Sequence, residues 1–245
     1  MAARKLNVLV YTGESSIIQD SYSILTQPGT SATLSSVRHC IYTLRRLLSP
    51  NYAVIPITES VLLKEPWAPT CALLVFPGGA DLGYCRVLNG TGNRIISAYV
   101  RHAGGRYLGF CAGGYYGSRR CEFEVGHPDR GMEVVGSREL GFFPGTCRGG
   151  AFQGFEYGSE KGARAARVVV GKRASQGQGQ VPAEFRCYYN GGGVFVGAEK
   201  MASEGVEILA EYGEELDVDF GEVKAAAVYC KVGEGAAVLT GPHPE

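Results

Sequence analysis

One cysteine in the middle of the chain has the neighbours expected of a nucleophile. Cys111 follows the apolar run Arg106–Phe110, which predicts a buried strand, and glycines lie two positions before it and two positions after it. A sharp turn from a strand into a helix needs small residues at those flanking positions, because the backbone passes close to itself there. The thiol would then lie at the start of a helix, where backbone N–H groups favour the thiolate. The alternative for this stretch alone is a glycine-rich turn with a buried, unreactive cysteine.

A thiol nucleophile usually needs a base, and the chain has only four histidines. Three of them have structural explanations in a helix, at a helix end or in a charged loop: His39, His102 and His127. His243 differs because it follows the apolar run Ala236–Thr240 and precedes Glu245 by two residues. This unit supplies a base and a carboxylate that can orient it, which completes a Cys–His–carboxylate set. The alternative is a polar tail without a catalytic role.

Acyl transfer also requires hydrogen-bond donors for the oxyanion that forms on the substrate. The backbone N–H of Ala112, directly after Cys111, is one candidate donor. Gly78 or Gly79, which follow the apolar run Cys71–Phe76, could provide the second donor without a side chain in the way.

The elements that must position these residues alternate between strands and helices. We predict strands at Leu6–Tyr11, Tyr52–Ile57, Cys71–Phe76 and Arg106–Phe110, and helices at Ser36–Leu48, behind a serine cap, and Asn93–His102. This order is typical of a doubly wound, largely parallel sheet, whose active site lies at the carboxyl ends of the strands. The glycine-rich segments 77–81 and 109–117 both follow such ends. In the second half we predict short strands, some paired as hairpins, and an exposed polar loop at Arg173–Gln180.

Composition narrows the classes of function. The 245 residues carry 24 basic and 24 acidic side chains, and this zero net charge predicts neither a nucleic-acid nor a membrane partner. The first apolar run is too short for a signal peptide, and no window approaches the roughly 18 apolar residues of a membrane span. Eight cysteines without a CxxC pair predict free thiols in the cytoplasm. Three of them fall in predicted loops, where pairing is an alternative: Cys85, Cys121 and Cys147.

With these pieces in place, the chain resembles the class I glutamine amidotransferase-like superfamily, and within it the amino-terminal domain of biotin–protein ligases. Four segments carry the resemblance: Phe76–Asp81, Gly105–Tyr115, Tyr188–Gly192 and Gly241–Glu245. It implies a single α/β domain over residues 1–245, with a flavodoxin-like three-layer sandwich, a mostly parallel central sheet and extra β-hairpins in the second half. It also implies that Cys111, His243 and Glu245 form a triad, with an oxyanion site at the Gly78–Gly79 turn.

The sequence departs from the amidotransferase pattern where glutamine would be recognised. Tyr115 and Tyr116 occupy the positions where those enzymes carry a glutamine or similar polar residue, and no Ser-Tyr-His-like segment is present. This argues against glutamine as the substrate. No Gly-Arg-Gly-Arg adenylate-binding run is present either, so we do not expect this chain to attach biotin.

The first hypothesis is therefore an amidase or related hydrolase that acts through a thioester on Cys111, without a metal or other cofactor. Its ligand would be a small amide or ester, with five candidate contact residues: Asp81, Tyr84, Tyr115, Tyr116 and Asn190. The second hypothesis is a ligand-binding or regulatory module that keeps the fold without turnover. The third is a redox or glyoxal-handling enzyme of the ThiJ/PfpI type, in which Glu14 would face Cys111. A homodimer is compatible with each of the three.

Overall fold

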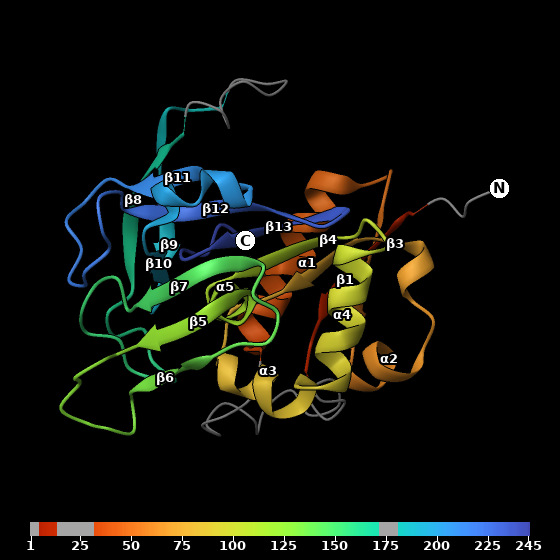
Figure 1. Cartoon of the computed structure of the whole chain (residues 1–245), viewed down its shortest axis with the longest axis horizontal. Helices are drawn as coiled ribbons and strands as arrows, with labels where there is room; N and C mark the ends of the chain where they lie inside the picture. Colours follow the sequence, from red (N-terminus) through yellow and green to blue (C-terminus); the bar gives the residue numbers. More distant parts are fainter. Residues whose placement is uncertain (1–4, 14–31, 172–180) are drawn as a thin grey trace.

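The computed structural model describes residues 5–13, 32–171 and 181–245. Its main feature is a nine-stranded sheet with the strand order β2-β1-β3-β4-β13-β12-β11-β8-β9 (Figure 1). The first five strands are parallel: β2 (Ala53–Ile57), β1 (Asn7–Tyr11), β3 (Cys71–Phe76), β4 (Arg106–Phe110) and β13 (Gly235–Thr240). The order 2-1-3-4, continued by a last parallel strand, is that of a flavodoxin-like sheet. The predicted fold class is confirmed.

Antiparallel strands extend this sheet and form a second, smaller one. The extension consists of β12 (Ala225–Val232), β11 (Val206–Tyr212), β8 (Arg164–Val170) and β9 (Glu184–Tyr189). The small sheet has the order β10-β7-β5-β6, made from β10 (Gly193–Phe195), β7 (Phe143–Gly149), β5 (Ser118–Phe123) and β6 (Val134–Ser137). The predicted hairpins of the second half are present in the β8–β9 and β12–β13 pairs.

Helices cover both faces of the parallel strands (Figure 1). The α-helices are α1 (Leu34–Leu48), α2 (Glu59–Lys64), α3 (Asp81–Leu88), α4 (Thr91–Arg101) and α5 (Ala112–Gly117), and single 3₁₀ turns lie at Ala68–Thr70, Ala198–Lys200 and Ala202–Glu204. Side chains alternate along β1, so that Val8 and Val10 pack against α1 while Leu9 and Tyr11 pack on the side of α3 and α4. This alternation produces the expected three layers.

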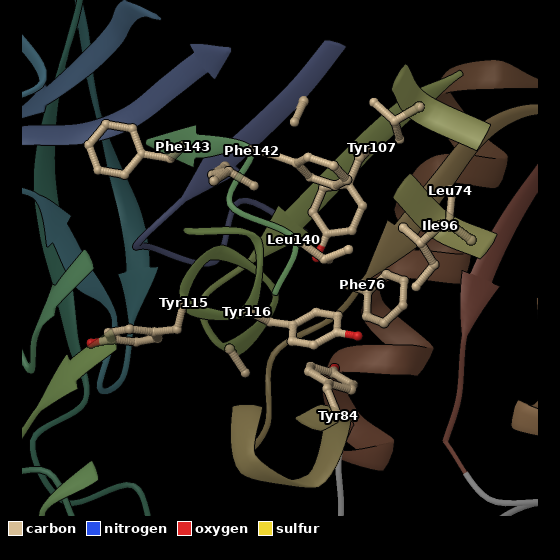
Figure 2. Close-up of a cluster of buried hydrophobic side chains, with 14 of the residues drawn as sticks. Leu74, Phe76, Tyr84, Ile96, Tyr107, Tyr115, Tyr116, Leu140, Phe142 and Phe143 are labelled. Carbon is tan, nitrogen blue, oxygen red and sulfur yellow. The ribbon is translucent and has the colours of Figure 1, made fainter. Parts of the chain in front are cut away.

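An aromatic cluster anchors the end of β3 beneath α5 (Figure 2). The Phe76 ring stacks on Tyr11 and Tyr107, with centroid separations of 4.8 and 5.3 Å. Tyr84 from α3 and Tyr116 from α5 lie 5.1 and 5.3 Å from the same ring. Large buried aromatic surfaces of this kind are a strong stabilising contribution to a core. These contacts fix the position of the end of β3, which precedes Gly78, relative to α5, which follows Cys111.

Several local predictions were wrong. Helix α1 begins two residues earlier than expected, and its cap is Thr33, whose side chain accepts the N–H of Ser36. The short elements α2, α3 and β5 were not predicted, because they are too short for a clear periodicity. The three cysteines assigned to loops lie in α3, β5 and β7: Cys85, Cys121 and Cys147. All eight cysteines fall in the described part of the chain and are free thiols, as expected.

Some features of the sequence lie outside the described residues. Glu14, on which the ThiJ/PfpI hypothesis depends, is one of them, and the predicted polar loop at 173–180 is another. Within the ranges that the structure describes, no helix is both long enough and apolar enough to cross a bilayer.

Candidate active site

Cys111 occupies a strained turn between β4 and α5. Its backbone angles are φ 45° and ψ −102°, and only Glu124 shares a positive φ among the non-glycine residues of the described chain. A Cβ atom on Gly109 would lie 2.3 Å from the carbonyl oxygen of Gly113, and one on Gly113 would lie 2.2 Å from that of Phe76. The two glycines are therefore required by backbone contact, as predicted from their spacing. Strain of this kind is concentrated at functional sites in proteins.

The end of β13 brings the predicted base to this turn. Thr240 accepts the backbone N–H of Cys111 at 2.9 Å, which aligns the two strand ends. The imidazole of His243 lies close enough to the Cys111 thiol for the thiol to raise the pKa of the ring, and its Nδ1 lies 2.9 Å from Oε1 of Glu245. The backbone N–H of His243 donates to Tyr188 at 2.8 Å, so the segment after β13 is held against β9. The structure thus brings together the three residues predicted as a triad.

Burial and charge act together on this group. Burial alone would lower the pKa of His243, but the charge and hydrogen bond of Cys111 and the pairing with Glu245 raise it well above its usual value. Burial would raise the pKa of Glu245, but the hydrogen bond and charge of His243, and a hydrogen bond from Ser36, lower it. The side chains of His243 and Glu245 are 12% and 3% exposed, so water screens this pair weakly. The arrangement favours an imidazolium beside a carboxylate.

A serine that sequence reasoning missed completes the set. The Ser36 hydroxyl lies 2.6 Å from Oε1 of Glu245, and the backbone N–H of Gly78 donates to it at 2.8 Å. Ser36 lies in the first turn of α1, where its type and position suggested only a helix start. No sequence signal relates it to His243 or Glu245, since more than 200 residues separate them and contact arises from packing of α1 on the sheet.

The three predicted oxyanion donors differ in availability. The N–H of Gly78 already donates to Ser36. The N–H groups of Gly79 and Ala112 have no acceptor among the residues that the structure describes. Backbone donors that stay free beside a nucleophile are suited to an oxyanion. Within the described part of the chain, the N–H groups of Gly79 and Ala112 thus have no protein acceptor, whereas that of Gly78 is already hydrogen-bonded.

The predicted tyrosine contacts are core residues. Tyr84, Tyr115 and Tyr116 are 0–4% exposed. Their hydroxyl groups donate to protein oxygens, which are the carbonyls of Pro77 and Gly191 and the side chain of Asn93, respectively. Tyr115 and Tyr116 leave α5 in opposite directions (Figure 2). With satisfied hydroxyls and almost no exposed surface, these side chains are not placed to contact a ligand. The signal that could have shown this is the run of large aromatics at strand and helix positions, which is typical of a core.

Of the remaining two predicted contacts, one is structural and one borders the site. Asp81 is buried and forms an ion pair with Arg138 at 2.6 Å. The carbonyl oxygen of Asn190 lies 3.7 Å from Sγ of Cys111, within the contact range of a thiol donor. The Asn190 side chain donates to Ser159 at 3.1 Å, and its Oδ1 is buried without a hydrogen-bond partner. Asn190 is therefore the predicted contact residue that the structure brings next to Cys111.

Tyr188 is an exposed residue that packs against His243. The residue is 45% exposed, and its ring meets that of His243 edge-on with the ring centroids 5.5 Å apart. Its hydroxyl donates to Glu160 at 2.8 Å. The ring of Tyr188 therefore contacts the imidazole and is also partly exposed to solvent. No group of three or more His, Cys, Asp or Glu side chains within the described ranges is arranged to hold a metal ion.

Comparison with solved structures shows the fold. A thua-like protein from Bacteroides uniformis superposes with a TM-score of 0.57 at 11% identity, over 99% of this chain and 84% of that one. A structure described as a glutamine amidotransferase gives a TM-score of 0.52 at 19% identity, over 85% of each chain.

Sequence comparison identifies relatives at higher identity. A biotin–protein ligase of Schizosaccharomyces pombe is 44% identical over 223 residues, which are 91% of this chain but 33% of the yeast protein. An uncharacterised protein of Chlamydia muridarum is 37% identical over 212 residues, covering 85% of this chain and 74% of the bacterial one. The chain thus spans one third of the length of its yeast relative. Residues 22–245 match the family described as "Biotin-protein ligase, N terminal", and the chain belongs to that family.

Proposed function

We propose that this protein is a cysteine-dependent hydrolase that acts on a small amide or ester through a thioester intermediate. The observation that carries the proposal is that Cys111 lies at a strained strand-to-helix turn and interacts with His243, which in turn pairs with Glu245. An activated nucleophile, a base and a group that orients the base are the parts that such chemistry requires. The substrate carbonyl would lie between Cys111 and the N–H groups of Gly79 and Ala112, for which the described residues provide no acceptor.

The residues account for each proton. Glu245 accepts a hydrogen bond from Nδ1 of His243, so this nitrogen carries a proton. The other ring nitrogen of His243 is the one that exchanges a proton with the thiol. His243 already holds the thiol proton in the imidazolium–thiolate pair, so Cys111 Sγ attacks the carbonyl carbon as a thiolate and the carbonyl π electrons move to the oxygen held by the two N–H groups. Collapse breaks the bond to the amine or alcohol, which leaves with the proton from His243. Water then attacks the thioester with His243 as base, which releases the carboxylic acid and restores the thiol.

Selective alkylation tests the activated thiol. Iodoacetamide at about pH 6.5 should label Cys111 faster than a free cysteine derivative in the same solution, because an imidazolium neighbour favours thiolate. Peptide mass spectrometry separates Cys111 from the seven other cysteines. His243→Ala should slow labelling at Cys111 while leaving the remaining cysteines unchanged. Labelling of the wild type no faster than the free thiol would contradict the proposal.

A second candidate function is a binding or regulatory module without turnover. The observation that favours it is the burial of Tyr115 and Tyr116 at the positions where glutamine recognition is expected. A thermal-shift screen with amino acids, amides and small anions, followed by product analysis for each compound that stabilises the protein, separates the two functions. Stabilisation with no acid product from any amide or ester favours the module, whereas product that depends on Cys111 favours the hydrolase. The match covers one third of the yeast biotin–protein ligase, so it supports no ligase activity for this chain.

A further inference from the structure

We propose that Ser36 is a positioning residue of this site, which holds the Glu245 carboxylate against His243 and ties it to the turn at Gly78. The inference rests on the proposed role of Cys111, His243 and Glu245. The hydroxyl of Ser36 is hydrogen-bonded to Glu245 and Gly78 rather than to the Cys111 thiol, so Ser36 acts through the carboxylate.

The direction of each hydrogen bond follows from the groups involved. A backbone N–H can only donate, so the Ser36 oxygen is the acceptor of the Gly78 bond at 2.8 Å. An ionised carboxylate can only accept, so the single hydroxyl proton of Ser36 is directed to Glu245 at 2.6 Å. The N–H of Gly78 polarises the hydroxyl and strengthens its donation, because hydrogen bonds in a chain reinforce one another. A chain of hydrogen bonds thus runs from Gly78 through Ser36 and Glu245 to His243.

The carboxylate depends on these two side-chain partners. Both Ser36 and His243 bond to Oε1 of Glu245, while Oε2 is buried without a hydrogen-bond partner. A buried charge is costly unless it is hydrogen-bonded, and here each of the two bonds therefore carries much of the compensation. Loss of Ser36 would leave His243 alone to hold the carboxylate in its anionic form.

Other titratable groups near the carboxylate do not replace Ser36. Cys40 lies one turn after Ser36 on α1, and burial raises the pKa of its thiol far above the usual value. Cys187 on β9 also lies within the influence of the Glu245 charge, and burial raises the pKa of its thiol to about 12. Both thiols are therefore neutral near neutral pH. Among the described residues, Ser36 and His243 are the side chains that hydrogen-bond to Glu245.

The hydrogen bond to Gly78 also fixes the turn on which His243 packs. His243 packs directly on Gly78, since a Cβ atom there would lie 2.3 Å from Cε1 of the ring. Ser36 holds that glycine by its N–H, and Gly79, a proposed oxyanion donor, follows it. One hydroxyl thus sets the position of the carboxylate and of the surface on which the imidazole rests.

Substitution of Ser36 tests the inference with a matched control in the same helical turn. Ser36→Ala should slow alkylation of Cys111 by iodoacetamide about tenfold at about pH 6.5, the effect of one hydrogen bond to a charged group. The acid limb of its rate–pH profile should move to higher pH, because Glu245 then takes up a proton more easily. Ser36→Thr, which keeps the hydroxyl, should restore the wild-type profile. Ser35→Ala, an exposed neighbour, should leave rate and profile unchanged.

The outcomes separate this inference from the proposed function. If Ser36→Ala is folded by thermal unfolding and keeps the wild-type rate and pH profile, the positioning role is refuted. If Ser36→Ala does not fold, Ser36→Cys replaces it, since a thiol of similar size is a weak donor and should give the same slow alkylation. If the wild type hydrolyses no amide or ester, the proposed hydrolase function is refuted. If alkylation of Cys111 is nevertheless slower in the Ser36 variants, the positioning role of Ser36 is supported. For any substrate that is turned over, Ser36→Ala should lower kcat with little change in KM, and a change confined to KM would contradict the positioning role.

Discussion

The substitution Gly78→Ala perturbs the candidate site by a single methyl group. Gly78 has no positive φ that would exclude alanine, so its backbone accepts the new side chain. The obstacle is His243, because the new Cβ would lie 2.3 Å from Cε1 and 3.0 Å from Nδ1 of the imidazole. The turn itself is held by Ser36 and is not free to withdraw. The ring must therefore move, and with it the contacts to Cys111 and Glu245.

The required movement sets the size of the effect. An ordinary carbon contact begins near 3.4 Å, so the ring must shift by about 1.1 Å from its position 2.3 Å from the new atom. A displacement of about 1 Å at a catalytic group costs on the order of 10²-fold in rate. We expect alkylation of Cys111 at about pH 6.5 to fall to the level of an unassisted thiol. We also expect a loss of about 1–3 kcal/mol in the free energy of unfolding from overpacking.

The assay compares Gly78→Ala with Gly131→Ala. Gly131 lies on an exposed turn, where a new Cβ meets only the exposed side chain of Asp129, at 3.1 Å. Both variants are alkylated with iodoacetamide over a pH series, and Cys111 is quantified by peptide mass spectrometry. Urea unfolding shows that each variant is folded under the assay conditions. If Gly78→Ala is folded and its Cys111 reacts as fast as in the wild type, the proposed dependence of the thiol on the position of His243 is wrong.

Three further predictions concern the carboxylate, the buried ion pair and the core. The pKa of His243 is raised and that of Glu245 is lowered, so their pairing stabilises the fold fully between pH 4.5 and pH 6.5, which are the ordinary pKa values of the two groups. The stability advantage of the wild type over Glu245→Gln, measured by urea unfolding, should peak there and decline as pH rises through the raised pKa or falls through the lowered one. Arg138→Met should cost about 3–5 kcal/mol in the same measurement, because it leaves the Asp81 carboxylate buried and unpaired. Tyr84→Phe should cost about 1–2 kcal/mol through one lost hydrogen bond, yet leave Cys111 alkylation unchanged, and a large change in alkylation would return Tyr84 to the site.

The core strands and the turn at Cys111 could be predicted because their causes are local. Apolar runs such as Cys71–Phe76 are buried on both faces of a parallel sheet, so they stand out as continuous segments. The glycines on both sides of Cys111 are demanded by contacts within the turn and with the end of β3. Elements such as β5, with its two arginines and a glutamate, carry no such pattern and depend on the strands beside them.

The sequence by itself determined the alternation of strands and helices and the residue types available for chemistry, because hydrophobic periodicity and glycine spacing act over a few residues. The tertiary structure decided which of those residues meet. It buries Tyr84, Tyr115 and Tyr116 in the core, because packing of the helices places a protein acceptor within hydrogen-bond distance of each hydroxyl. It also brought Ser36 to Glu245 across more than 200 residues, because the start of α1 and the segment after β13 reach the same end of one parallel sheet. A contact of that kind follows from strand order and packing, and no local pattern encodes it.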